Sequence, residues 1–357
     1  QLGSSFTNYL HVDFFLWLII CEGTIKQVST NPNYGNEDQE NDNTDERFLH
    51  VIKYSWQLRS RKASFCDDLV ASRRLYLNQT TQLMSAVSYK WKSSDGKELY
   101  GHNWKVENPW AVIVLVHGMG EHCHRYEHVA KAFNEAGYSV YSFDHRGHGR
   151  TEGKKGHTPS YNHLLDVVND VLKLAKKENV DKPVFLYGHS MGGNVVLNMA
   201  LKRKPEIKGV IASSPWLKLA FEPPALQVML AKVVKGVFPG LTQPSKLDVN
   251  SISRDKEEVT KYSNDPLVHD RISTIFFLSV HEAGLYALDH AKEFGYPLYI
   301  FHGSDDKLTS HDTSKEFAEA VPNSTWKSWD GLYHECHNEP EKEEVIKGII
   351  DWVRTHA

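Results

Sequence analysis

Three residues far apart in the chain, Ser190, Asp306 and His334, have the types and the order that nucleophilic hydrolysis requires. A serine hydroxyl is a weak nucleophile at neutral pH, so it needs a base, and the base needs an orienting carboxylate. Ser190 lies in Gly188-His189-Ser190-Met191-Gly192, between an apolar run and a helical pattern. The glycines remove side chains that would collide in a sharp strand–turn–helix. We therefore predict an exposed nucleophile at Ser190, the alternative being a structural turn.

The predicted acid and base each follow a late strand, so their loops reach the same sheet edge as Ser190. Asp306 would orient the imidazole of His334 and stabilise its charge, and His334 would accept the serine proton and later pass it to the leaving group. Two nearby residues are the alternatives for the acid and for the base. We expect Asp305 to face solvent, and His337 to line the pocket or to begin the next helix.

Two main-chain N–H groups are the predicted oxyanion donors. Met191 follows the nucleophile at a helix N-terminus, where an N–H points outward. The second donor is expected in His117-Gly118-Met119-Gly120, at Met119. Because both donors are main-chain groups, the methionine side chains are expected to pack or to line an acyl channel.

The chain has 20 histidines, a residue type that often binds metal ions. His122-Cys123-His124 is contiguous, and His124 and His128 lie four apart on a predicted helix. Zinc sites usually need three or four ligands at diagnostic spacing, and no such set is complete here. We predict no metal and no cofactor.

The composition of the 357 residues limits the partners and the compartment. A net charge of −4 gives no reason to expect nucleic acid or an anionic membrane. The four cysteines form no disulfide framework and no Cys-x-x-Cys pair, which favours a reducing compartment; they are Cys21, Cys66, Cys123 and Cys336. We predict a cytoplasmic protein that makes transient peripheral contact with membranes.

Residues 1–83 differ from the rest. The apolar run at 14–21 is far shorter than the roughly 20 residues that span a bilayer, and no basic residue precedes it. Residues 31–46 are polar and acidic, which is typical of disorder. The first methionine is Met84, where the regular pattern begins. We predict that 1–83 are a poorly ordered extension or a gene-model artefact without a catalytic role; the alternative is a membrane or targeting segment.

From residue 84 onward, strands and helices alternate, which predicts an α/β fold: a mostly parallel eight-stranded sheet flanked by helices. An Ser94-Asp95-Gly96 turn joins the first two strands. The predicted strands are 85–91, 98–104, 111–116, 138–143, 184–187, 207–212, 297–301 and 324–329, and the predicted helices include 125–136, 161–178, 310–320 and 345–356.

The alternation breaks at about 215–290, which we interpret as a helical cap inserted over the carboxyl ends of the strands. A helical apolar stripe covers 222–237, and 240–270 is rich in Pro, Ser, Asp and Asn. Apolar residues in this part would form an acyl-binding wall and a surface for transient membrane contact; they are Phe221, Leu226, Met229, Leu230 and Val233. The alternative is that these helices simply cover the sheet.

Six motifs in order resemble the monoacylglycerol lipase and lysophospholipase-like branch of the α/β-hydrolases, which is related to serine aminopeptidases. The resemblance covers about 85–357 and rests on His117–His122 with Arg125-Tyr126, Asp144–Gly149, Gly188–Gly193, Asn264–Leu267, Gly303–Asp306 and Tyr333–Pro340. It implies the triad Ser190, Asp306 and His334, with the donors Met119 and Met191. Thr151 stands where the family commonly has serine.

In monoacylglycerol lipases the corresponding polar groups lie near the glycerol end of the pocket, which makes four residues candidate substrate contacts: Glu121, Arg125, His189 and His337. The alternative for Glu121 and Arg125 is that they only brace the oxyanion loop.

The expected reaction is hydrolysis of a carboxylic ester through an acyl-enzyme, on monoacylglycerol or a similar single-chain lipid ester. One alternative is a serine aminopeptidase-type peptidase, which needs acidic groups to hold a substrate amine; Glu222, Glu257, Glu258 and Asp265 are available. Another is a non-catalytic hydrolase-like binding protein, but such chains usually lose a triad residue or an oxyanion glycine.

Overall fold

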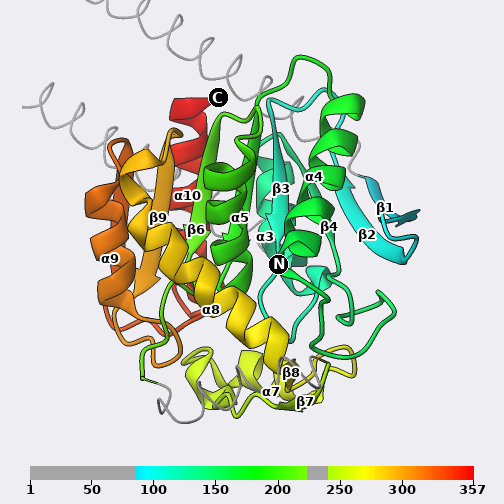
Figure 1. Cartoon of the computed structure of the whole chain (residues 1–357). Coiled ribbons are helices and arrows are strands. Elements are labelled where there is room, and N and C mark those ends of the chain that lie inside the picture. Colours follow the sequence, from blue (N-terminus) through cyan, green and yellow to red (C-terminus); the bar gives the residue numbers. More distant parts are fainter. Residues whose placement is uncertain (1–84, 223–239) are drawn as a thin grey trace, which may run out of the picture. The chain divides into compact units, whose positions relative to one another are not determined.

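The computed structural model describes residues 85–222 and 240–357, and these residues contain the predicted sheet of eight strands (Figure 1). The strand order is β1-β2-β4-β3-β5-β6-β9-β10. Strand β2 is antiparallel to both of its neighbours, β1 and β4, and all the other neighbouring strands are parallel. The strands are β1 (Ser85–Lys92), β2 (Glu98–Lys105), β3 (Ala111–Val116), β4 (Tyr138–Phe143), β5 (Val184–His189), β6 (Gly209–Ser213), β9 (Leu298–Gly303) and β10 (Ser324–Trp329).

The strands form where the sequence predicts them, for recognisable local reasons. Gly96 turns the β1–β2 hairpin with a φ of 78°, a conformation that glycine adopts without steric cost. The central strand β3 is buried along its whole length. Its alternate side chains enter two separate hydrophobic clusters, one on each face of the sheet, as the two-residue period of a strand requires. Both faces of the sheet must therefore be covered.

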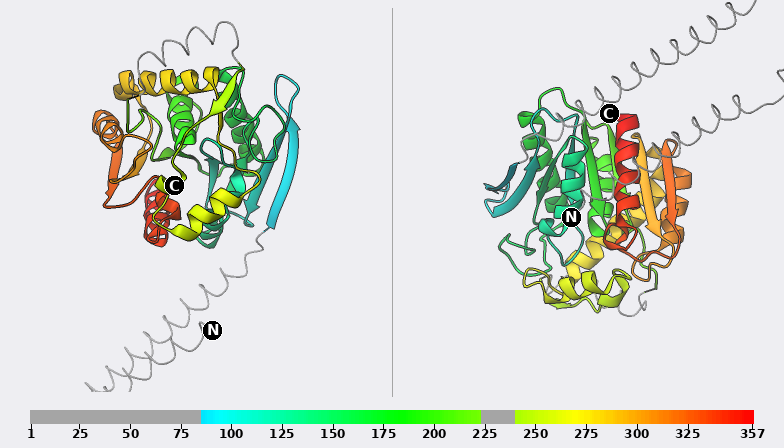
Figure 2. Two further views of the ribbon diagram at one scale, coloured as in Figure 1. Left: turned by 90° about the horizontal axis from the view of Figure 1, so that it is seen from below. Right: turned by 180° about the vertical axis from the view of Figure 1, so that it is seen from behind.

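Helices cover both faces (Figures 1 and 2). Helices α3 (Glu127–Glu135) and α10 (Lys342–His356) share one hydrophobic cluster, on the face seen from behind in Figure 2. The other cluster includes α4 (Tyr161–Glu178), α5 (Met191–Arg203), α8 (Thr274–Asp289) and α9 (His311–Ala320). Short 3-10 turns follow at η1 (Cys123–Tyr126), η2 (Val249–Ser251), η3 (Ala291–Glu293) and η4 (Cys336–Asn338). The layers hold the carboxyl ends of the parallel strands at one edge of the sheet.

The described part of the predicted insertion has two different halves. Helix α8 packs along α5, and its residues Phe276 and Val280 are fully buried in the cluster on that face. This half covers the body of the fold. The other half holds α7 (Lys256–Asn264) and a small antiparallel ribbon that the sequence did not suggest, formed by β7 (Thr242–Pro244) and β8 (Arg271–Ser273). The predicted helix at 222–237 lies almost wholly outside the described residues, as do residues 1–83.

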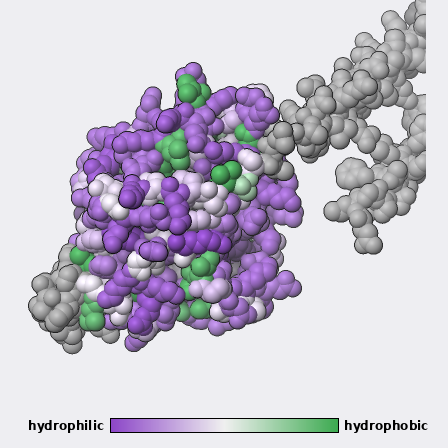
Figure 3. Space-filling view, turned by 90° about the vertical axis from the view of Figure 1, so that its right-hand side faces the viewer, coloured by the Kyte–Doolittle hydropathy of each residue, from purple (hydrophilic) through white to green (hydrophobic). Residues whose placement is uncertain are grey.

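The surface is mainly hydrophilic on the side that carries the β1 edge, with small separate apolar patches (Figure 3). Among the helices of the described residues, none has the length and the apolar character that would let it cross a bilayer.

Candidate active site

Ser190 stands at the sharp turn between β5 and α5, with φ and ψ of 54° and −116°. A side chain other than glycine rarely adopts a positive φ, so the surrounding bonds must hold this turn in place. The Ser190 N–H donates to the carbonyl of Ser213 at 2.9 Å. A Cβ on Gly192 would lie 2.1 Å from the Val116 carbonyl oxygen, and one on Gly188 would lie 2.2 Å from the Gly192 oxygen. The predicted strand–turn–helix, and the steric reason for its glycines, are confirmed.

The structure brings Asp306 and His334 together, although 28 residues separate them. Asp306 Oδ2 lies 2.6 Å from His334 Nδ1. An ionised carboxylate only accepts hydrogen bonds, so Nδ1 carries the ring proton and Nε2 is left to accept one. His334 and Ser190 line the same cavity. This arrangement has the elements that a serine hydrolase uses to transfer the nucleophile's proton.

Two further side chains hold the carboxylate, and the sequence analysis missed them. His302 Nε2 donates to Asp306 Oδ2 at 2.8 Å, and the Thr309 hydroxyl donates to the same oxygen at 2.9 Å. The second oxygen, Oδ1, accepts the N–H groups of Leu308 and Thr309 at 2.7 and 3.1 Å. His302 directly precedes the motif Gly303–Asp306, and its place four residues before the acid was the available signal.

The two alternatives for acid and base lie elsewhere. Asp305 is exposed and accepts the hydroxyl of Ser304. His337 is fully buried, and its ring stacks on that of Tyr126 with 4.8 Å between centroids. Neither residue contacts the pair formed by Asp306 and His334 through a hydrogen bond among the described residues.

Burial and charge act in opposite directions on the pair. Burial disfavours the imidazolium of His334, but the Asp306 carboxylate, with Glu335 and Glu121, raises the pKa of His334 above its usual value. Burial would raise the pKa of Asp306, yet the His334 and His302 rings hold it well below the usual range. Asp306 therefore stays ionised at neutral pH, and His334 is poised to gain a proton.

The loop after β3 approaches the nucleophile closely. A Cβ on Gly118 would lie 2.7 Å from Glu121 Oε1 and 3.3 Å from the Cβ of Ser190, so glycine at this position lets the main chain run close to the nucleophile. The Gly118 N–H donates to Glu121 Oε1 at 2.6 Å. Met119, the next residue, lines the cavity, whereas Met191 begins α5 beneath Ser190. The main chain at 119 and 191 therefore flanks the nucleophile.

Arg125 joins two loops of the site. It donates to Glu121 Oε2 at 2.7 Å and makes a two-pronged contact with Glu335, at 2.8 and 2.7 Å. Burial disfavours the charge of Arg125, but the two carboxylates raise its pKa well above the ordinary value. Glu121 and Glu335 line the cavity, whereas Arg125 and His337 are absent from its lining. Arg125 thus braces the loop after β3 against the loop after β10, which carries His334 and Glu335 and is called the histidine loop below.

His189, beside the nucleophile, also lines the cavity. Burial and the neighbouring His334 lower its pKa to about 4, so the ring is neutral at neutral pH. Its Nδ1 lies 3.2 Å from the Ser213 hydroxyl. Of the four predicted substrate contacts, Glu121 and His189 face the cavity.

The cavity has a volume of about 820 Å³ and a mostly hydrophobic wall. Apolar and aromatic residues on this wall come from the segment after β6, from the segments on either side of α7, from α8 and from the loop after β9; they include Trp216, Leu219, Phe221, Leu241, Leu247, Val249, Ile252, Ile272, Phe277 and Leu308. The same wall holds Ser190 and His334 together with their polar sequence neighbours His189 and Glu335. A mainly apolar cavity that also holds these polar groups suits a ligand with one long apolar part and one polar end.

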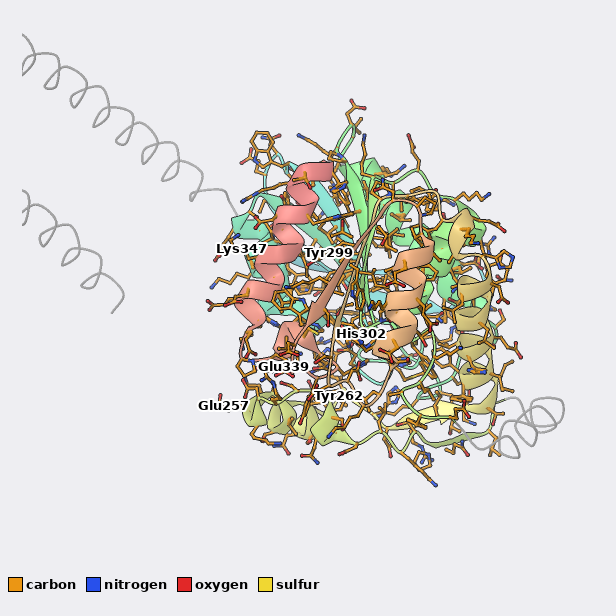
Figure 4. The ribbon with its side chains drawn as sticks, turned by 90° about the vertical axis from the view of Figure 1, so that its left-hand side faces the viewer. Glu257, Tyr262, Tyr299, His302, Glu339 and Lys347 are labelled. Atoms are coloured by element: carbon orange, nitrogen blue, oxygen red, sulfur yellow. The ribbon has the colours of Figure 1, made fainter. Side chains whose placement is uncertain are left out.

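The wall is bonded to the histidine loop. The Glu335 N–H donates to the Ile252 carbonyl at 2.7 Å, and Arg254 Nε donates to Glu339 Oε2 at 3.0 Å. The ring of Tyr262, on α7, lies against the Arg125 guanidinium, 4.6 Å from the centroid. Figure 4 shows Tyr262 and Glu339 at the same end of the molecule.

The histidines that were weighed as metal ligands have other partners. His124 Nε2 lies 2.9 Å from the Tyr100 hydroxyl, and His128 Nε2 lies 2.8 Å from the carbonyl of His337. Within 85–222 and 240–357, no group of three or more His, Cys, Asp and Glu side chains is placed to hold a metal ion. Thr151 donates its hydroxyl to the Asp144 carbonyl, a bond that serine would also make.

Comparisons with known proteins agree with this architecture. Residues 107–341 match the family described as serine aminopeptidase, S33. A monoacylglycerol lipase of Mycolicibacterium smegmatis is 32% identical over 252 residues, which cover 70% of this chain and 90% of that protein. An uncharacterized abhydrolase domain-containing protein of Dictyostelium discoideum is 36% identical over 267 residues, but these are only 28% of its length.

Among solved structures, the monoacylglycerol lipase of Paleococcus ferrophilus is similar, with 34% identity and a TM-score of 0.66. The match covers 77% of this chain and all of that one. The fold, the order of the motifs and these similarities agree, and the chain belongs to the serine aminopeptidase S33 family, in the monoacylglycerol lipase-like branch of the α/β-hydrolases.

Proposed function

We propose that this protein hydrolyses monoacylglycerol, or a similar single-chain lipid ester, through an acyl-enzyme on Ser190. The chain is a carboxylic ester hydrolase by family. The observation that carries the proposal is that Ser190 and the Asp306-paired His334 open into one large, mainly apolar cavity. An acyl chain needs such a wall, and a peptide does not.

In the first half-reaction, Ser190 Oγ attacks the ester carbonyl carbon while His334 Nε2 takes the hydroxyl proton. The carbonyl π electrons move to oxygen, and the N–H groups of Met119 and Met191 are proposed to bind that oxyanion. The intermediate then collapses, the bond to the alcohol oxygen breaks, and His334 protonates the departing glycerol.

In the second half-reaction, water attacks the acyl-Ser190 carbonyl and gives its proton to His334. The second tetrahedral intermediate releases the fatty acid, and the proton returns to the serine oxygen. Glu121 and His189 are the proposed neighbours of the glycerol end, because they are the polar candidates that line the cavity. Asp306 stabilises the imidazolium in both steps.

The test is labelling by a fluorophosphonate probe together with an activity profile. We expect Ser190→Ala to abolish both labelling and hydrolysis of long-chain monoacylglycerols, with unchanged thermal stability. Labelling that persists in Ser190→Ala, or a sharp preference for acetyl over long acyl esters, would contradict the proposal. A chain that binds lipid ester without turnover would instead be a hydrolase-like binding protein.

The peptidase alternative finds less support in the cavity. None of the four carboxylates considered as amine ligands is on its wall. Asp265 instead lies 2.9 Å from His122 Nε2, and Glu258 accepts from Lys261 at 2.8 Å. Aminoacyl-amide substrates distinguish the two functions: the ester proposal expects cleavage of lipid esters and none of these amides.

We also propose transient contact with a lipid surface at the mouth of the cavity. Three residues on the cavity wall are among the exposed large hydrophobic residues: Phe221, Leu241 and Leu247 are 58%, 56% and 40% exposed. Exposed apolar residues beside a lipid pocket favour contact with a membrane interface. Since Cys123 and Cys336 are both free, a reducing compartment, the cytoplasm, is the proposed location.

Sedimentation with zwitterionic vesicles tests the surface contact. We expect Phe221→Asp and Leu241→Asp to reduce the bound fraction. Val180→Asp is the matched control, because Val180 is 70% exposed but does not line the cavity. An equal loss of binding in all three variants, or none in any, would refute this role of the mouth.

A further inference from the structure

The side chain of His117 lies directly behind the loop that carries Met119. Strand β3 ends at Val116, so His117 is the first residue of that loop, and it is fully buried. Its Nε2 accepts the main-chain N–H of His145 at 2.9 Å. Its Nδ1 lies 2.7 Å from the carbonyl oxygen of Gly118.

These two contacts fix where the ring proton is. A ring nitrogen that accepts a hydrogen bond from an N–H group carries no proton, so the neutral imidazole has its proton on Nδ1. A carbonyl oxygen only accepts, so Nδ1–H donates to Gly118. Strands β3 and β4 are parallel neighbours, which is why the residues that follow them, His117 and His145, meet at the same edge.

The Gly118 carbonyl belongs to the same planar trans peptide as the Met119 N–H, and the two groups point in opposite directions. Holding the carbonyl therefore aims the N–H. The preceding peptide is held as well, since the Gly118 N–H donates to Glu121 Oε1 at 2.6 Å. Within the described part of the chain, no residue accepts the Met119 N–H, which leaves it available to a ligand oxygen.

We propose that His117 is a positioning residue of the oxyanion hole, which aims the Met119 N–H at the ester oxygen by holding the Gly118 carbonyl. This inference rests on the proposed ester hydrolysis. His117 does not line the cavity, so its effect on the reaction passes through the Gly118–Met119 peptide that it holds.

Two conservative variants separate its two hydrogen bonds. In His117→Asn the amide nitrogen stands near the place of Nδ1 and is able to donate to Gly118. In His117→Gln the amide oxygen reaches the place of Nε2 and is able to accept from His145, but nothing remains at the Nδ1 place. The variants thus keep the donor or the acceptor, at similar polarity.

Because loss of an oxyanion donor costs about 10²–10³ in turnover, we expect misaiming it in His117→Gln to lower kcat about 10- to 100-fold, with KM within about twofold. We expect His117→Asn to keep kcat within about fivefold of the wild type, and fluorophosphonate labelling rates to follow the same order. Equal kcat values for both variants and the wild type, or a lower kcat for Asn than for Gln, would overturn the inference.

A measurement on the wild-type chain decides the question if a variant does not fold. The imidazole ¹⁵N resonances of His117 should show the tautomer protonated at Nδ1; protonation at Nε2 would refute the hydrogen-bond arrangement. The proposed function fails separately, if the wild type does not cleave lipid esters or Ser190→Ala still does.

Discussion

Replacing Arg125 by Met tests how the two loops of the active site are held together. The change removes three short hydrogen bonds, two to Glu335 and one to Glu121, from a side chain that is 8% exposed. It leaves two carboxylates that are only 3% and 4% exposed without their shared cation. Methionine keeps much of the volume, so the loss is chiefly electrostatic.

Removing one partner of a buried ion pair typically costs about 3–5 kcal/mol. The carboxylates keep some donors here: Glu121 still accepts from the Gly118 N–H and the Tyr126 hydroxyl, and Glu335 still accepts from Asn338. We therefore expect the lower part of that range, about 3–4 kcal/mol. At about 2–4 °C per kcal/mol, the midpoint of thermal unfolding should fall by about 6–16 °C.

The loss of stability in Arg125→Met should become smaller as the pH falls. In the wild type, burial opposes ionisation of Glu335, but Arg125 lowers its pKa to about 2. The pKa of Glu335 is lower in the folded chain than the value of about 4.3 in the unfolded chain. Its carboxylate therefore stabilises the folded wild type above about pH 4.3, and this stabilisation is lost as the pH falls through the folded pKa. In Arg125→Met the Glu335 carboxylate is buried without its cation, which raises its pKa. Protonation on acidification then removes the unpaired charge and stabilises the folded variant. The difference in the free energy of unfolding between the wild type and the variant should therefore become smaller from pH 7 towards pH 5.

Chemical denaturation at several pH values measures this difference, with Arg203→Met as the matched control. Arg203 pairs with Asp166 at 3.0 Å but is 44% exposed, so its loss should cost less than about 1 kcal/mol. The double variant Arg125→Met with Glu335→Gln should recover part of the stability. A loss at Arg125 as small as that at Arg203, or one that grows on acidification, would refute the reasoning.

Three further predictions concern the reacting groups and the turn. The pKa of His334 is raised, and its neutral form is the proposed base. We therefore expect kcat/KM to rise with pH, with a midpoint above the ordinary histidine pKa of about 6.5. A pH–rate profile with a lower midpoint would contradict this. Thr309→Val removes a 2.9 Å hydrogen bond to Asp306, the proposed acid of the triad. Since hydrogen bonds to charged groups contribute about 1.5–3 kcal/mol, we expect kcat to fall about tenfold at unchanged KM. An unaltered kcat in steady-state assays would count against this prediction. Gly192→Ala should fail to fold or melt far lower, because its Cβ would lie 2.1 Å from the Val116 oxygen, whereas Gly295→Ala, with open space around it, should melt like the wild type in calorimetry.

The local part of this architecture was predictable from sequence. Alternation of strands and helices, the turn at Gly96 and the glycines around Ser190 act over a few residues, and the structure confirms all of them. The order of the motifs also placed Asp306 and His334 at one edge, where they are bonded.

The supporting bonds were not predictable, because they join residues with no pattern between them. Arg125 and Glu335 are 210 positions apart, and neither has a sequence neighbour that indicates the other. His302 and Thr309 are close to Asp306 in the sequence, but only the backbone path of that loop turns both towards one oxygen. The β7–β8 ribbon has three residues a strand, too few for a period to be recognised.

Because Ile252 and Arg254 are hydrogen-bonded to the histidine loop, the pocket wall at Ile252 and the proposed base His334 are mechanically coupled. A movement of Ile252 large enough to admit substrate would also move Glu335 and its neighbour His334, and would separate the His334 ring from Asp306. Widening the pocket at Ile252 to suit bulkier acyl chains would therefore lower the rate as well as change the selectivity. Engineering that aims at selectivity alone has more freedom at Leu241 and Leu247, which also line the cavity and are 56% and 40% exposed.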